Sequence, residues 1–244
     1  MPSEEKEKRR ASKPTIQETF LYLESLFFTF FLACDLTGRT FVFSSTVWKF
    51  SVIVLALLYV LVELFRKGKG DVLFRRRLFL FFAMAMTLVS DLFLLVRNDN
   101  YIFGVCTFIV AQIFHALEIE RSKKQAILSF SLRVAIPLAA ILVLFLCRAA
   151  DPLYLAVACY APQLIGNFLE HFLGIFQAKD REEKRRSLLL AIAFALFLGC
   201  DICVGLSNLG FAAVSIWIWA FYAPSQALIA ISCGRFCQNE TESD

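Results

Sequence analysis

The stretch from Val89 to Ala116, VSDLFLLVRNDNYIFGVCTFIVAQIFHA, decides how the chain folds. It consists of two apolar segments joined by the four-residue polar turn RNDN. A membrane-spanning helix needs ~20 predominantly apolar residues, so each half is a predicted span. Asp91 lies inside the first span, and Gln112 and His115 lie inside the second. Because ionisable groups are costly within hydrocarbon, Asp91 predicts a functional site.

The composition of the whole chain agrees with this interpretation. Of its 244 residues, 59% are hydrophobic, against roughly 45–50% in a typical soluble domain. The net charge is +4, and the basic residues fall in short blocks between apolar runs. Such blocks orient membrane spans, so they do not indicate a nucleic-acid partner. The sequence therefore predicts an all-α integral membrane bundle in a lipid bilayer.

Eight apolar segments predict eight transmembrane helices within a single domain, residues 15–234. Residues 1–14 and 235–244 are expected to be cytosolic tails, the first of them disordered. The predicted spans are Phe20–Cys34, Val47–Phe65, Leu78–Val96, Tyr101–Ile119, Ile127–Cys147, Leu153–Phe176, Leu188–Ser207 and Phe211–Ser232.

Most of the 25 Lys and Arg residues lie in the N-terminal tail and in the loops after the second, fourth and sixth segments. This bias predicts that both termini are cytosolic. No cleavable signal peptide is visible in the first fourteen residues. We expect a multi-pass protein of the endoplasmic reticulum or a similar internal membrane in a eukaryote, and of the cytoplasmic membrane in a bacterium.

A short internal repeat relates the two halves of the chain. Asp91 precedes Asn98 by seven residues, and Asp201 precedes Asn208 by the same interval. A Gln follows in the next segment of each half. Four spans separate the two copies, which predicts a parallel 4+4 repeat about an axis along the membrane normal.

The two aspartates are also predicted to share one depth. Asp91 lies fourteen residues beyond Arg77, and Asp201 lies fifteen beyond Arg186. At 1.5 Å per residue, both carboxylates stand about 21–22 Å from the cytosolic boundary. Lys49 begins the second segment at a comparable depth. We therefore expect one polar pocket that contains the three charged groups.

The sixth segment carries a polar stripe on one helix face, at steps of three and four residues: Tyr160, Gln163, Asn167 and either Glu170 or His171. Hydrogen bonding between helices is the favoured role for these side chains. Three charged residues near segment ends are expected to extend to the membrane surface: Glu24, Arg133 and Glu170.

Metal and redox chemistry are weakly indicated. His115 and His171 lie in distant segments without the short spacing of zinc ligands, so packed or hydrogen-bonded histidines are favoured. Cys200 and Cys203 form a CxxC inside a span, where packing is the favoured role. Cys233 and Cys237 at the last boundary leave palmitoylation open. We expect no metal and no cofactor.

A buried carboxylate pair supports two kinds of chemistry. One Asp that stays protonated can act as a general acid, while an ionised partner acts as a base that activates water. The same pair can instead bind a proton or a cation in a carrier. The residues alone leave both alternatives open.

Two groups of residues form a longer pattern. The first is Ser90-Asp91-Leu92-Phe93-Leu94, followed by Gly104, Phe108 and Gln112-Ile113-Phe114-His115. The second is Leu196-Phe197 and Cys200-Asp201, followed by Tyr222 and Gln226. In order and spacing this pattern, with Lys49 at the start of the second span, resembles the lysoplasmalogenase family, also called YhhN-like membrane proteins. The sequence departs from the family pattern at Gln112 (usually His), His115 (usually Tyr) and Cys200 (usually Ser).

The resemblance implies hydrolysis of the vinyl-ether bond of a lysoplasmalogen, a lysophospholipid, to a fatty aldehyde and glycerophosphoethanolamine or glycerophosphocholine. It implies Asp91 and Asp201 as catalytic residues. The expected substrate contacts are Lys49, Asn98, Gln112, His115, Tyr222 and Gln226. The alternatives are a non-enzymatic carrier or lipid-binding protein, and a catalytically silent family member. Homo-oligomerisation is left open.

Overall fold

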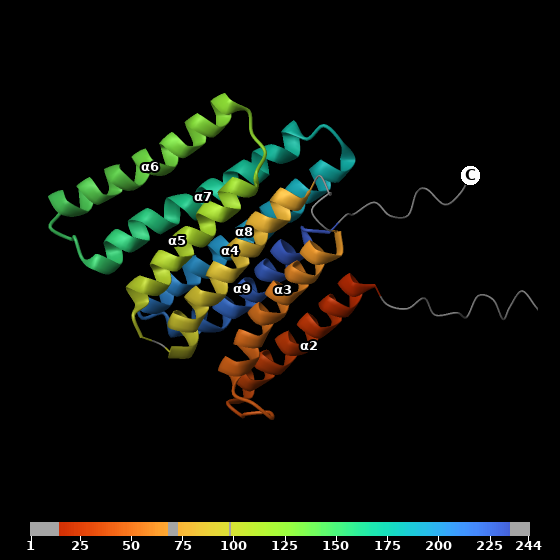
Figure 1. The fold of residues 1–244 in the computed structure, drawn as a ribbon. Coiled ribbons are helices and arrows are strands. Elements are labelled where there is room, and N and C mark those ends of the chain that lie inside the picture. Colours follow the sequence, from red (N-terminus) through yellow and green to blue (C-terminus); the bar gives the residue numbers. More distant parts are fainter. Residues whose placement is uncertain (1–14, 68–72, 98, 235–244) are drawn as a thin grey trace, which may run out of the picture.

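The computed structural model describes residues 15–67, 73–97 and 99–234. The two predicted tails and Asn98 lie outside the described residues. The described part of the chain is all-α (Figure 1). Its eight α-helices are α2 (Ile16–Thr37), α3 (Ser45–Lys67), α4 (Phe74–Asp91), α5 (Tyr101–Glu118), α6 (Lys123–Leu146), α7 (Pro152–Gln177), α8 (Arg181–Asn208) and α9 (Ser215–Ile231). A π-helix, η1 (Leu92–Arg97), extends α4, and a 3-10 turn, η2 (Ala212–Val214), precedes α9.

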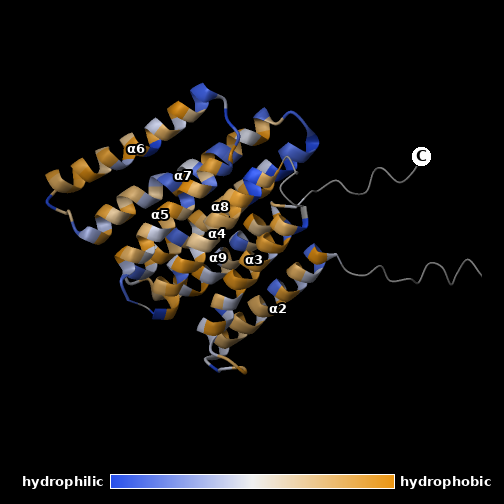
Figure 2. Cartoon of the chain, in the orientation of Figure 1, coloured by the Kyte–Doolittle hydropathy of each residue, from blue (hydrophilic) through white to orange (hydrophobic). Residues whose placement is uncertain are grey.

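Seven of these helices are long and apolar enough to cross a membrane, which makes the chain a multi-pass integral membrane protein. Figure 2 shows apolar residues along most of the helical length and hydrophilic residues at the helix ends. The eighth helix, α7, has 26 residues, but its polar stripe lowers its hydropathy below that of the other seven. The predicted α-helical class is confirmed, and α7 is the segment on which an eight-span count depends.

Side-chain caps explain why α2 is longer than the predicted first span. The Thr15 hydroxyl accepts a hydrogen bond from the backbone N–H of Glu18, and the Glu18 carboxylate accepts one from the N–H of Thr15. This reciprocal pair satisfies two backbone donors that the first helical turn leaves free. Gly38, at φ +65°, ends the helix in the left-handed conformation that favours glycine.

The helices pack as a bundle in which consecutive helices lie side by side from α2 to α5 and again from α6 to α9. Three helix pairs connect the first four helices with the last four: α3 packs on α9, α5 packs on α7, and α2 makes a smaller contact with α9. α6 lies at one edge against α7, and α2 lies at the other against α3 and α9 (Figure 1). The start of α2 and the end of α9 meet at one end of the bundle, because Gly234 lies beside Gln17.

The core lies between α2, α3, α4, α5, α7, α8 and α9. Phe31, Leu80, Phe194, Phe197 and Ile229 are buried there almost completely. α6 differs, because among its residues only Arg133 and Pro137 are buried. Lipid is as apolar as a leucine side chain, so burial of apolar surface does not hold α6 in place. Polar contacts therefore dominate the docking of this helix.

Candidate functional site

Each of the two predicted catalytic aspartates accepts a hydrogen bond from a tyrosine of another helix. The Tyr222 hydroxyl in α9 donates to Oδ2 of Asp91, the last residue of α4, over 2.7 Å. The Tyr160 hydroxyl in α7 donates to Oδ2 of Asp201 in α8, also over 2.7 Å. Asp91 is 5% exposed, and Asp201 is partly buried. A hydrogen bond to a charged group contributes about 1.5–3 kcal/mol, so each tyrosine fixes its carboxyl group in place.

A continuous series of aromatic rings connects the two Tyr–Asp pairs. The ring of Tyr160 lies 5.8 Å from that of Phe108, which lies 5.7 Å from Phe197. Phe197 in turn lies 5.4 Å from Tyr222 in an edge-to-face arrangement. Phe108 and Phe197, between the two tyrosines, are both buried, so the series of rings runs through the interior of the bundle.

The backbone around Asp91 departs from a regular α-helix. η1 begins at the next residue, and single π-helical turns occur frequently at functional sites. The Ser90 hydroxyl donates a 2.6 Å hydrogen bond to the carbonyl of Gly104 in α5. A Cβ atom on Gly104 would lie 2.6 Å from the side chain of Leu94, so glycine allows α5 to approach η1. These contacts fix Asp91 at the point where α4 meets α5.

Lys49 pairs with a carboxylate that sequence reasoning missed. Its Nζ lies 2.7 Å from Oδ2 of Asp35, one residue beyond the predicted end of the first span. The same Nζ lies 5.3 Å from the ring centroid of Trp219, and Trp219 packs edge-to-face on Tyr222. Lys49 therefore reaches the Tyr222–Asp91 pair through one intervening ring. The acidic residue at the end of α2 was the available signal for this ion pair.

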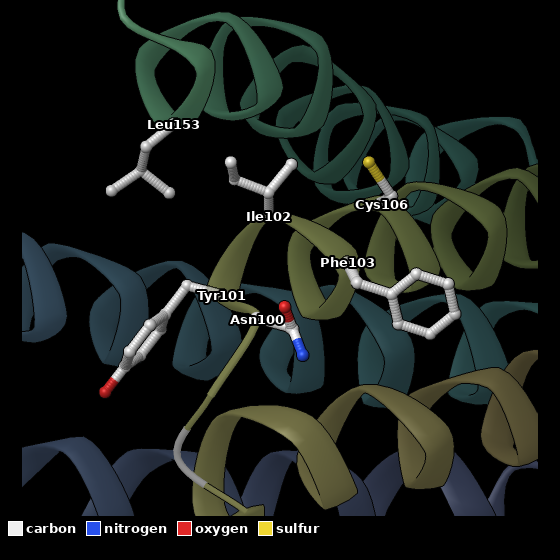
Figure 3. A pocket seen from close by; sticks show the side chains of 6 residues that line it. All are labelled: Asn100, Tyr101, Ile102, Phe103, Cys106 and Leu153. Carbon is white, nitrogen blue, oxygen red and sulfur yellow. The ribbon is translucent and has the colours of Figure 1, made fainter.

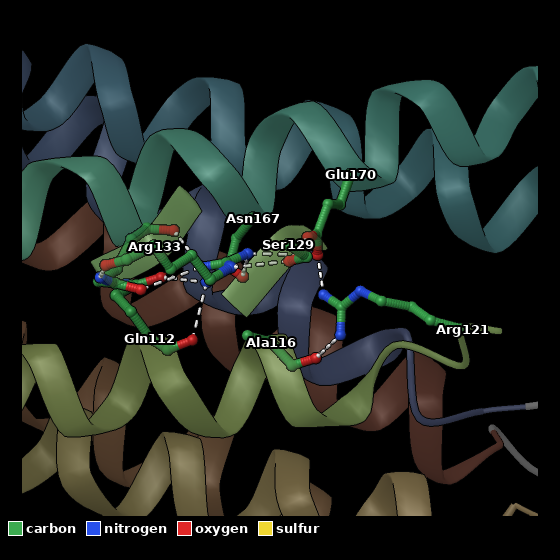
Figure 4. Close-up of polar contacts among 8 residues, drawn as sticks. Gln112, Ala116, Arg121, Ser129, Arg133, Asn167 and Glu170 are labelled. Carbon is green, nitrogen blue, oxygen red and sulfur yellow. Dashed lines mark hydrogen bonds and ion pairs between the residues drawn. The ribbon is translucent and has the colours of Figure 1, made fainter. Parts of the chain in front are cut away.

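Gln112 belongs to a second polar network, in which side chains of α5, α6 and α7 contact one another (Figure 4). The Asn167 side-chain amide donates to Oε1 of Gln112 over 2.8 Å and to its backbone carbonyl over 3.0 Å. Arg133 donates to Oδ1 of Asn167 over 2.8 Å. The amide nitrogen of Gln112 has no hydrogen-bond partner among the described residues.

The expectation that Arg133 extends to the membrane surface is wrong. Arg133 is 6% exposed, and its guanidinium donates to the backbone carbonyl of Gln163 over 2.9 Å. The group lies directly over Gly166, whose absent Cβ would be 2.9 Å from the guanidinium carbon. Inward acceptors and this space make the buried position favourable. The predicted interhelical hydrogen bonding of Gln163 and Asn167 is confirmed.

Glu24 is also buried, at 5% exposure, so its predicted extension to the surface is wrong. Neither of its carboxylate oxygens has a hydrogen-bond partner among the described residues. Glu170 is about one-fifth exposed and forms ion pairs with Arg121 and Arg133. Neighbouring helices cover Glu24 and Arg133 because these residues point toward the bundle and not toward lipid.

Both histidines pack on one phenylalanine, as expected for packed histidines. His171 stacks on the Phe194 ring at 5.3 Å, and His115 meets the same ring edge-on at 5.2 Å. Glu118, three residues beyond His115, lies 3.9 Å from His115 Nδ1 and accepts a hydrogen bond from Arg186. Sequence reasoning missed Glu118. Its i,i+3 spacing from His115 was the signal for a shared face.

Gln226 and the cysteines, the remaining residues that the sequence singled out, make few polar contacts in the described part of the chain. Gln226 is fully buried, and its amide donates weakly to the Ser225 hydroxyl over 3.5 Å. Cys200, Cys203 and Cys233 are buried free thiols, whereas Cys237 lies outside the described residues.

The cavities in the described part of the chain include two that lie beside α5 and α7. One, of about 580 Å³, lies beside the start of α5 (Figure 3). It is lined by Asn100, Tyr101, Ile102, Phe103, Cys106 and Leu153. The other, of about 890 Å³, lies between α6, α7 and the loop before α6. Asp91 and Asp201 line neither of these two cavities.

The fold and the buried polar groups define a multi-pass helical membrane protein with two Tyr–Asp pairs inside the bundle. A model of the YhhN family matches residues 44–233, about three quarters of the sequence. The chain therefore belongs to the YhhN family, whose members include lysoplasmalogenases. No match was found among curated proteins or among solved structures.

Proposed function

We propose that this protein is a membrane hydrolase that cleaves the vinyl-ether bond of a lysoplasmalogen, with Asp91 and Asp201 as its acid–base pair. The observation that carries the proposal is that each carboxyl group is held inside the bundle by a tyrosine hydroxyl, and that aromatic rings connect the two pairs. Membership of a family that includes lysoplasmalogenases supports this choice of reaction. The products are a fatty aldehyde and glycerophosphoethanolamine or glycerophosphocholine.

The reaction needs two proton-transfer roles and no redox step. A protonated carboxyl group gives its proton to the enol carbon of the vinyl ether, which produces an oxocarbenium ion. The ionised carboxylate stabilises this cation and accepts a proton from water as the water adds. The second carboxyl group, now protonated, gives its proton to the ether oxygen of the resulting hemiacetal, and the first carboxylate accepts the proton of the hemiacetal hydroxyl. The C–O bond then breaks to give the aldehyde and the glycerol hydroxyl. One water is consumed, and both carboxyl groups return to their starting states.

The proposed substrate contacts differ in how near they lie to the aspartates. Tyr222 touches Asp91 directly, and Lys49 lies one aromatic ring away, where its ammonium can hold the substrate phosphate. Gln226 is one helical turn beyond Tyr222. Gln112 and His115 belong to the second network and to the Phe194 contact, so we assign them to the substrate further from the reacting bond.

The proposal is tested by aldehyde release from a lysoplasmalogen by the purified full chain, with an ester lysophospholipid as the control substrate. Asp91→Asn and Asp201→Asn should each lower turnover by at least ~10²-fold, because each removes one proton-transfer group. Asp180→Asn is the matched control: Asp180 caps α8, and Asn caps helices equally well. Near-normal turnover in both core variants would contradict the assignment.

The same experiment separates hydrolysis from transport. If the purified protein releases no aldehyde but gives proteoliposomes a pH-dependent uptake that Asp91→Asn abolishes, the Asp residues bind a proton or cation in a carrier. Hydrolysis by wild-type protein together with loss in both Asn variants supports the enzyme. Oligomeric state does not enter either outcome.

We also propose that the bundle consists of two four-helix halves in a parallel repeat, with both termini cytosolic. The packing supports the repeat, because each neighbouring pair in the first half has a counterpart in the second. The repeat relates α3 to α7 and α5 to α9. It therefore converts the contact of α3 with α9 into the contact of α7 with α5, and both contacts are present. α7 then spans the membrane as the counterpart of α3. Labelling of single cysteines introduced at residues 100 and 150 from outside intact cells tests this topology.

A further inference from the structure

The larger cavity combines a charged end with an apolar slot. It follows α7 from Pro162 to Gln177, fifteen residues or about 22 Å at the rise of an α-helix. Its volume of about 890 Å³ is in the range of small-molecule sites. The α6 side of the slot does not belong to the tightly packed core, since α6 contributes little buried surface. A bound molecule could therefore enter laterally, from the lipid beside α6.

Each long side of the slot contributes a row of apolar side chains. Its α6 side is formed by Leu128, Leu132 and Ile136, and its α7 side by Ile165, Leu169 and Leu173. All six of these residues are between 44% and 62% exposed, so they leave a large apolar surface uncovered. Because α6 and α7 each contribute a single row of apolar side chains, the space between the rows suits one hydrocarbon chain.

The opposite end of the cavity carries charges of both signs. Four cations line it: Arg76, Arg121, Lys179 and Arg186, whereas Arg133 lies further along the slot, over Gly166. Four carboxylates lie among them: Glu118, Glu120, Glu170 and Glu183. Ion pairs cross-link this end, for example between Arg76 and Glu120 at 3.3 Å and between Arg121 and Glu170 (Figure 4). Such a mixed lining complements a zwitterion better than it complements an ion of one sign.

Buried polar atoms in the cavity wall lack partners. His171 lines the cavity and is 7% exposed, and its Nε2 has no hydrogen-bond partner among the described residues. Glu118 lines the same end, and its buried Oε2 also lacks a hydrogen-bond partner within the part of the chain that the structure describes. Buried polar groups are nearly always hydrogen-bonded, so such atoms are candidates for contacts with a ligand.

We infer that the α6–α7 cavity binds a single-chain amphiphile with a zwitterionic phosphodiester headgroup. The phosphate contacts the guanidinium groups, the headgroup ammonium contacts the carboxylates, and the hydrocarbon chain lies between the two apolar rows. A two-chain lipid is disfavoured because each wall offers one row of side chains. Inorganic phosphate shares only the headgroup chemistry and lacks the chain that the slot accommodates.

This site is separate from the Tyr–Asp pairs. His171, at the charged end, lies eleven residues along α7 from Tyr160, which corresponds to about 16 Å. A headgroup at the charged end therefore does not touch the tyrosine that holds Asp201. The cavity holds an amphiphile at a second position, and the inference does not require the aspartates to be catalytic.

Photo-crosslinking tests the site. The full chain in detergent is incubated with a lysophosphatidylcholine that carries a diazirine in its chain, and the labelled peptides are identified by mass spectrometry. We expect label in α6 and α7 around residues 128–136 and 165–173. Excess lysophosphatidylcholine should compete, a fatty acid of equal chain length should compete less, and inorganic phosphate should not compete. Label spread evenly over the lipid-facing helices would overturn the proposal.

Neighbouring residues of α6 supply a matched pair of variants. Leu128 lines the cavity and Ile127 does not, while both are more than 60% exposed. Leu128→Trp should lower labelling by about tenfold because the larger ring fills the slot, and Ile127→Trp should leave it unchanged. Leu169→Trp, with Val157→Trp as control, repeats the comparison on α7 in case a variant of α6 fails to fold. Equal labelling in both members of both pairs would refute the site.

The result is independent of hydrolysis. Asp91→Asn should retain normal labelling whether or not the wild-type protein releases aldehyde. Loss of aldehyde release with intact labelling therefore counts against the Asp assignment alone. Loss of specific labelling with intact aldehyde release counts against the α6–α7 site alone.

Discussion

The Tyr222 hydroxyl donates a 2.7 Å hydrogen bond to Oδ2 of Asp91, although 131 residues separate them in the chain. The bond joins the end of α4 to the middle of α9, beside the π-helical turn that follows Asp91. Tyr160 and Asp201 form a similar pair with helices α7 and α8. Each half of the chain thus contributes one carboxyl group that accepts a hydrogen bond from a tyrosine hydroxyl.

Tyr222→Phe and Tyr160→Phe should each lower aldehyde release by about 10- to 100-fold. Each substitution keeps the ring contacts and removes a hydrogen bond to a carboxyl group, which contributes about 1.5–3 kcal/mol. Tyr154→Phe is the control, since Tyr154 is exposed on the same helix as Tyr160. Rates measured with purified variants at saturating substrate check the prediction, and an unchanged rate in both core variants would show that the hydroxyls do not position the reacting groups.

Lys49→Met should raise the KM for a lysoplasmalogen by roughly tenfold with little change in kcat, because it removes a charge-assisted contact to the substrate phosphate. Asp35→Asn breaks the same ion pair but keeps the cation. A partly exposed ion pair contributes at most ~1 kcal/mol to stability, so both variants should fold. A KM that rises equally in the two variants would mean that the ion pair, and not phosphate binding, is the role of Lys49.

Glu24 and Glu63 should respond in opposite directions to replacement by methionine. Both are buried, but Glu63 forms an ion pair with Arg66 at 2.9 Å, whereas the Glu24 oxygens lack hydrogen-bond partners among the described residues. Removing an unsatisfied buried carboxyl group should add about 1–3 kcal/mol to the free energy of unfolding, and removing the paired one should lower it. Thermal denaturation in detergent checks this, and a lower Tm for Glu24→Met would contradict it.

Gly166→Ala should destabilise the attachment of α6. The added methyl group would lie 2.9 Å from the Arg133 guanidinium carbon, and displacing that group disturbs its bonds to Gln163 and Asn167. We expect a loss of roughly 1–3 kcal/mol. Gly205→Ala in α8 meets no atom within 4 Å and should be neutral or stabilising, since alanine favours helix. Proteolysis of the α6–α7 region as well as Tm would report the change.

The fold was largely predictable because each membrane-spanning helix requires a long apolar run, which is visible in the sequence. Each of the eight α-helices in the described residues overlaps one predicted segment. The differences lie at the ends and in polarity. Thr15 and Gly38 lengthen α2, since caps and a left-handed glycine act outside the apolar run. The polar stripe of α7 lowers its hydropathy, although its hydrogen bonds to α5 and α6 place it inside the bundle.

The candidate site was predictable only in part. Periodicity assigned Asn167 and Gln163 to one face, and the structure confirms their role between helices. The periodicity of α6 could not show that Arg133 points toward α7, because this orientation depends on the space left by Gly166 in α7. Glu118 and Asp35 went unnoticed because both lie at span boundaries, where charged side chains are common.

The sequence by itself determined the class of protein, because the length and hydropathy of the apolar segments depend on local composition alone. It also determined which residues carry unusual chemistry, since a carboxylate within an apolar segment is evident without coordinates. Only the tertiary structure decided the partners: Tyr222 for Asp91, Tyr160 for Asp201, and Asp35 for Lys49. A sequence pattern identifies the polar face of a helix, but the packing of distant helices decides what that face meets.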